Sequence, residues 1–139
     1  MTDLKKSLPS WNSADQKLGD VVWNTVHKDL EKILLRAYQA ADPPLHTMKR
    51  DVLREEEKKF SFISRGDFCN EYFEVQEKIA NRLASEVDYI NYLSEVYSAY
   101  VSGLVQSLIR KKTFFQGKKD RLVELLIKSV LSDISVVMY

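Results

Sequence analysis

Turn-forming residues and cysteine are scarce in this 139-residue chain, which has four Gly, three Pro and one Cys. Because a protein built from many short strands needs frequent turns, this shortage excludes an all-β fold and favours an all-helical one. The single cysteine, Cys69, excludes an internal disulfide, a cysteine-rich zinc site and a thiol redox pair. We interpret Cys69 as a small buried or half-buried residue.

Long hydrophobic runs are also missing, and neither sign of charge dominates. No stretch has the roughly eighteen uncharged apolar residues of a membrane span, and the start lacks the pattern of an export signal. We therefore expect a cytoplasmic protein with no membrane segment. Lys and Arg number 21 against 20 Asp and Glu, so the net charge gives no general attraction to nucleic acid. The basic turn 110–121 could suggest phosphate binding, but cations at a helix C-terminus are the simpler interpretation, and no nucleic-acid partner is expected.

The motifs of common catalytic sites are missing too. The sequence has no Gly-rich phosphate loop, no Gly-x-Ser-x-Gly and no His-Glu-x-x-His. Its two histidines, His27 and His46, have no carboxylate or cysteine at ligand spacing, so no metal site is predicted. We expect no enzymatic activity.

Apolar periodicity predicts a single domain over 13–139, preceded by an arm, 1–12, whose Trp11 docks on the domain. The arm gives way to a helix start with capping-box spacing at Ser13 and Gln16. This first segment, 13–38, is one helix or two joined at Gly19 or near His27, and it stops before Pro43 and Pro44. Further helices are predicted over 46–64, 66–87, 88–109 and 118–139.

The helix that begins near Gly66 is the most amphipathic, and we place its inner face in the core. Ser64-Arg65-Gly66 predicts the end of the preceding helix, and Asp67 is predicted to cap the next one. The apolar face repeats every three or four residues, at Phe68, Tyr72, Val75, Ile79 and Leu83. The charged run 54–59 in the preceding helix is predicted to be a solvated face with local ion pairs.

The last two predicted helices are apolar over too wide an arc for one contact each. This excess favours a symmetric homodimer in which the pair forms a four-helix bundle. The interface residues predicted from the pattern are Leu104, Leu108, Leu126, Val130, Ile134 and Val137. The apolar pattern runs to the last residue, and we expect the chain to be the front part of a longer signalling polypeptide.

Three blocks of sequence resemble the globin domain of globin-coupled sensors, the haem-based front ends of bacterial chemotaxis transducers and related signalling proteins. They are 29–38, ending in Tyr38; 66–72 with 79–83; and 132–139. The resemblance implies a globin-like fold, a dimer bundle that transmits the signal, and a C-terminal output domain in the same chain. It also implies that Tyr38 occupies the distal position of a haem pocket, with Tyr72 and Ile79 as possible lining.

In this family the proximal histidine that ligates haem iron stands where this chain has Leu83. Leucine has no lone pair to give to iron, and the segment between Tyr38 and Gly66 is shorter than in haem-binding relatives. We therefore expect no cofactor and a haem-free sensor domain. The alternatives are a haem-binding gas sensor, with haem held by hydrophobic contact or through His27 or His46, and an unrelated helical dimerisation or adaptor module.

Overall fold

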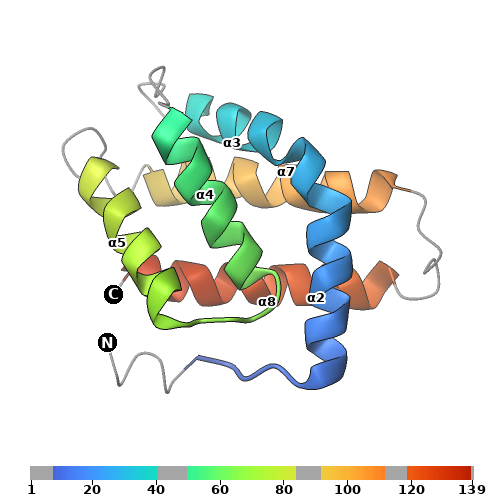
Figure 1. Ribbon diagram of the computed structural model, residues 1–139. Coiled ribbons are helices and arrows are strands. Elements are labelled where there is room, and N and C mark those ends of the chain that lie inside the picture. Colours follow the sequence, from blue (N-terminus) through green and yellow to red (C-terminus); the bar gives the residue numbers. More distant parts are fainter. Residues whose placement is uncertain (1–7, 41–49, 84–91, 112–118, 139) are drawn as a thin grey trace.

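The computed structural model describes residues 8–40, 50–83, 92–111 and 119–138 (Figure 1). Within these ranges the regular structure is entirely helical, which confirms the predicted all-α class. The elements are α2 (Ser13–Val26), the 3-10 turn η1 (His27–Asp29), α3 (Leu30–Gln39), α4 (Arg50–Ile63), α5 (Asn70–Leu83), the π-helical segment η2 (Tyr92–Val96), α7 (Tyr97–Arg110) and α8 (Lys119–Met138).

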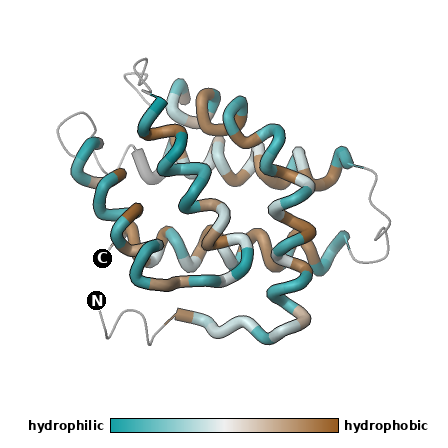
Figure 2. Tube along the Cα trace, in the orientation of Figure 1, coloured by the Kyte–Doolittle hydropathy of each residue, from teal (hydrophilic) through white to brown (hydrophobic). Residues whose placement is uncertain are grey.

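The helices form two layers that cross steeply. In Figure 1, α2, α4 and α5 lie in front, and α7 and α8 run behind them in opposite directions. Helix α3 packs on α7, α4 on α5, and α2 on both α7 and α8. Brown, apolar positions recur along the helices in Figure 2, while α4 and α5 carry long teal stretches. The core therefore lies between the layers.

The first predicted segment is divided close to His27. Helix α2 ends at Val26, and the His27 ring stacks on Trp23 with a centroid distance of 5.1 Å while its Nδ1 lies 2.9 Å from the Trp23 carbonyl oxygen. The start of α2 differs from the predicted capping box. Asn12, one residue earlier, caps the helix by accepting a bond of 2.7 Å from the Asp15 amide.

The turn between α4 and α5 tests two predictions, the end of a helix at Gly66 and the cap at Asp67. Gly66 has a φ of 67° and its amide bonds to Ile63, while the Asp67 amide bonds to the Phe62 carbonyl. This is a Schellman ending, so the predicted helix stop is confirmed. The predicted cap at Asp67 is wrong because α5 begins only at Asn70, three residues later, so that Cys69 directly precedes the helix.

Trp11 docks on the domain, as predicted. Its side chain is 9% exposed and lies so close to Gly66 that a Cβ there would come within 2.0 Å of the indole. Lys128 of α8 lies over the indole at 5.0 Å from the ring centroid. The segment before α2 is thus held to both the α4–α5 turn and α8.

The inner face of α5 is buried as its spacing predicts, through Phe68, Tyr72, Val75 and Ile79. Leu83 is the last residue of α5, and its side chain lies outside the described residues, as do Pro43, Pro44, His46, the predicted start at Asp88 and most of the basic turn. None of the described helices combines the length and apolar character needed to cross a membrane.

Candidate functional site

A cluster of buried polar side chains lies between the two layers of helices. It contains the carboxylates of Glu56 and Asp133, the ammonium of Lys59, the amide of Gln76, and the hydroxyls of Tyr38, Tyr72 and Tyr97. These residues come from α3, α4, α5, α7 and α8, so the cluster joins helices that are far apart in the sequence. We call this set the buried ionic cluster.

Asp133 of α8 is the acceptor at the centre of this cluster. Its side chain is 0% exposed. Its Oδ1 accepts a hydrogen bond of 2.6 Å from Tyr72, and its Oδ2 accepts one of 2.7 Å from Tyr97. The Lys59 Nζ lies 3.1 Å from the same Oδ2. Charge-assisted bonds of this kind compensate for the cost of taking a carboxylate out of water.

Lys59 is the only cation of the buried ionic cluster, and it is 1% exposed. Its ammonium donates to Gln76 Oε1 at 3.0 Å and to the Tyr97 hydroxyl at 3.2 Å. Glu56, three residues earlier in α4, lies 3.8 Å away. An ammonium with several oxygen partners is stabilised in place, so Lys59 links α4 to α5, α7 and α8.

Glu56 differs from Asp133 because it has fewer donors around it. Burial raises the pKa of the Glu56 carboxyl, an effect that Lys59 and the hydrogen bond from Tyr38, 2.7 Å long, offset in part. A proton on Glu56 would leave Lys59 and Asp133 as a neutral pair. Burial and the neighbouring Asp133 charge also raise the pKa of Tyr72, so its hydroxyl stays protonated and serves as a donor.

The cluster leaves little free space. A cavity of about 10 Å³ lies beside it, lined by Tyr38, Glu56, Tyr97 and Tyr100 among others. This volume is about that of one water molecule. Among the described residues, no three His, Cys, Asp or Glu side chains are grouped so that they could hold a metal ion. The carboxylates, ammonium and hydroxyls of the cluster can therefore hold charge and protons inside the core.

The described residues that the resemblance assigns to a haem pocket have other partners in the core. Tyr38 and Tyr72, which the resemblance assigns to the haem pocket, are 2% and 0% exposed and are bonded to Glu56 and Asp133. Ile79 is packed in the core. The hydroxyls of both tyrosines are thus already engaged by carboxylates of the cluster, and a leucine such as Leu83 has no lone pair to give to iron.

The predicted interface residues divide into two groups. Leu104, Leu108, Leu126 and Val130 belong to the core of the single chain, so their side chains have no surface left for a second subunit in this conformation. Ile134 and Val137 are half-buried. The large apolar side chains that are exposed on the last two helices are Ile109, Ile127, Leu131 and Met138.

Sequence reasoning missed most of the buried ionic cluster. The run 54–59 was predicted to be solvated, but Glu56 and Lys59 are buried, because the apolar rows of α4 carry them inward with Val52, Phe60 and Ile63. A signal was present in α8. Asp133 falls in register with Leu122, Leu126 and Val130, and a charge within such a row must find a partner.

Comparison with protein-family models, with curated proteins and with solved structures found no match for this chain.

Proposed function

We propose that this chain is a signal-transduction sensor domain of the globin-coupled-sensor type that works without haem and acts through a dimer interface. The observation that carries the proposal is the bond from Tyr38, the family's distal position, to the buried carboxylate of Glu56. In this proposal, charged side chains occupy the space that relatives give to the cofactor. By the same resemblance, an output domain in the same chain receives the signal.

The layered arrangement also supports the proposal. In Figure 1 the front helices α4 and α5 cross the antiparallel pair α7–α8, as the globin-like fold implied by the resemblance would require. The buried ionic cluster lies at this crossing, with α4 and α5 contributing Lys59 and Tyr72, and α8 contributing Asp133. A shift of α8 against α4 would break these bonds, so the cluster couples the core to the helix proposed for the interface.

A stripe of exposed apolar side chains on α8 supports the dimer. It consists of Ile127, Leu131 and Met138, which are 40%, 58% and 68% exposed, with half-buried Ile134 between the last two. Their spacing of four, three and four residues follows one face of a helix. A second copy of the same stripe, packed across a two-fold axis, would remove this surface from water.

Reconstitution with haemin tests the cofactor part of the proposal. We expect no Soret band that survives desalting, either in the natural chain or in a Leu83→His variant, because Tyr38 is buried and bonded to Glu56. A stable Soret band in the natural chain that disappears in His27→Ala or His46→Ala would contradict the proposal and favour the haem gas sensor.

Sedimentation velocity tests the interface. We expect the natural chain to form dimers and Leu131→Glu to form monomers with unchanged helicity. Ser98→Glu, on an exposed position of α7, is the control and should leave the mass unchanged. Leu126→Glu should instead lose its fold, because Leu126 is buried within one chain. A natural chain that stays monomeric at high concentration would favour the adaptor module, with the stripe on α8 open to a different partner.

A further inference from the structure

A groove runs between α3 and α7 on the side of the molecule away from α5. It has a volume of about 430 Å³, which is in the range of small-molecule sites. Ile33, Ala99 and Gly103 contribute apolar atoms to it. The two helices approach closely here, since a Cβ on Gly103 would lie 2.8 Å from a methyl carbon of Ile33.

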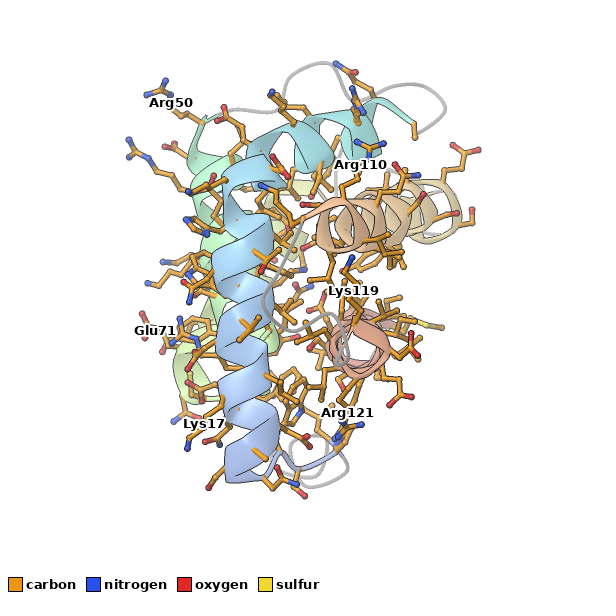
Figure 3. The ribbon with its side chains drawn as sticks, turned by 90° about the vertical axis from the view of Figure 1, so that its right-hand side faces the viewer. Lys17, Arg50, Glu71, Arg110, Lys119 and Arg121 are labelled. Atoms are coloured by element: carbon orange, nitrogen blue, oxygen red, sulfur yellow. The ribbon has the colours of Figure 1, made fainter. Side chains whose placement is uncertain are left out.

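The walls of the groove are positively charged. Lys32 and Arg36 line it from α3, and Arg110 lines it from α7. Figure 3 shows Arg110 at the near end of α7, directly below α3. The carboxylate in the lining, Asp29, already accepts a hydrogen bond of 2.7 Å from Ser107 and lies 3.5 Å from Lys111. Those contacts, with the charge of Lys32, keep the pKa of Asp29 below its usual value.

The three basic side chains of the lining therefore exceed the available negative charge. Within the described ranges, neither Arg36 nor Arg110 has a carboxylate within ion-pair distance, whereas Lys58, Arg65 and Arg121 each do. Lys32 and Arg36 are four residues apart on one helix, a placement of like charges that destabilises the helix. Folding alone gives no reason for this concentration of charge, and an anionic ligand would.

The polar side chains between the cations favour a phosphate group. Gln106 accepts a bond of 3.4 Å from Arg110 and donates one of 3.3 Å to Ser102, so amide and hydroxyl groups lie beside the guanidinium. A phosphate monoester carries nearly two negative charges and three acceptor oxygens, whereas a single carboxylate carries one charge and two oxygens. The groove is also too large for an inorganic anion alone, and its apolar atoms suit the organic part of an ester.

We propose that the groove between α3 and α7 binds a small phosphate monoester, with Arg36 and Arg110 holding the phosphate from opposite walls. The site rests on the groove itself and is independent of the haem-free core and of the dimer.

Isothermal titration with phenyl phosphate at low salt tests the site. We expect saturable binding to the natural chain and a loss of at least about tenfold in affinity in the double variant Arg36→Gln/Arg110→Gln, since each guanidinium supplies charge-assisted bonds. The control is Arg50→Gln/Arg54→Gln, which removes the same charge from exposed positions outside the groove and should bind as the natural chain does. Thermal melting checks that both variants are folded, and either single Arg→Gln variant can replace a double that is not.

Further ligands distinguish a phosphate monoester from a free phosphate ion. Inorganic phosphate and phenol should each bind at least about tenfold more weakly than phenyl phosphate, because the first lacks the apolar ring and the second lacks the phosphate. Four results would each overturn the proposal. Phenyl phosphate does not bind, inorganic phosphate binds as tightly as phenyl phosphate, only a phosphoserine peptide binds, or the two double variants lose affinity equally.

Discussion

Asp133→Ala provides the sharpest test of the buried ionic cluster. The substitution removes the acceptor of the Tyr72 and Tyr97 hydroxyls and the nearest anion to Lys59, while the ammonium stays in the core. Removing one partner of a buried ion pair costs about 3–5 kcal/mol. Because domains of this size have a total stability of about 5–15 kcal/mol, the variant should be close to unfolding.

Urea unfolding followed by circular dichroism would measure this loss. Asp120→Ala is the matched control, since Asp120 is an exposed carboxylate of the same helix, and it should change the free energy of unfolding by less than about 0.5 kcal/mol. The double variant Lys59→Met/Asp133→Leu removes both charges and should recover most of the loss, because apolar residues of similar volume can replace a buried pair.

Two results with these variants would contradict the role given to the Asp133 carboxylate. A loss below about 1 kcal/mol in Asp133→Ala would mean that the carboxylate is not held in a dry core. A double variant as unstable as Asp133→Ala would mean that the unpaired Tyr72 and Tyr97 hydroxyls or the packing around them, and not the unpaired ammonium, cause the loss. Asp133→Asn keeps an acceptor oxygen without the charge and should fall between the two.

Other variants test the same structure in different ways. Because burial raises the pKa of Glu56, the folded chain holds this proton more strongly than the unfolded chain, so stability is highest below the unfolded pKa and falls as pH rises through the folded pKa. Glu56→Gln should remove this fall, and urea midpoints measured between pH 4 and 8 would show it; equal slopes in both proteins would contradict the raised pKa. Gly66→Ala should cost more than about 1 kcal/mol, because the residue has a positive φ and its Cβ would overlap Trp11; an unchanged melting temperature would mean that Trp11 is not docked there. Gly19→Ala should be destabilising as well, since its Cβ would lie 2.2 Å from the Ser64 carbonyl oxygen, and a thermal melt as high as that of the natural chain would contradict this close approach of α2.

Features that depend on neighbouring residues were predictable from the sequence. The scarcity of Gly and Pro indicated helices, and the three- and four-residue spacing of Phe68, Tyr72, Val75 and Ile79 indicated which face of α5 is buried. The end of α4 followed from the need for a residue that tolerates positive φ, which Gly66 supplies. These are local rules, because a helix period and a helix cap act over a few residues.

Helix boundaries were less predictable, because two signals competed at each one. Asn12 and Ser13 are both good N-cap residues, and the structure uses Asn12. Asp67 could cap a helix by its chemistry, but the turn that ends α4 is followed by a start of α5 only at Asn70.

The helical class and the buried face of α5 could be read from the sequence, since both depend on residues close together in the chain. The partner of the buried Asp133 carboxylate follows only from the tertiary structure. Glu56 and Lys59 look like part of a solvated run until α8 brings Asp133 to within 3.1 Å of the ammonium, across 74 positions of sequence (133 − 59). The cost of burying a charge depends on what surrounds it in space, so tertiary packing decides whether such a run lies in water or in the core.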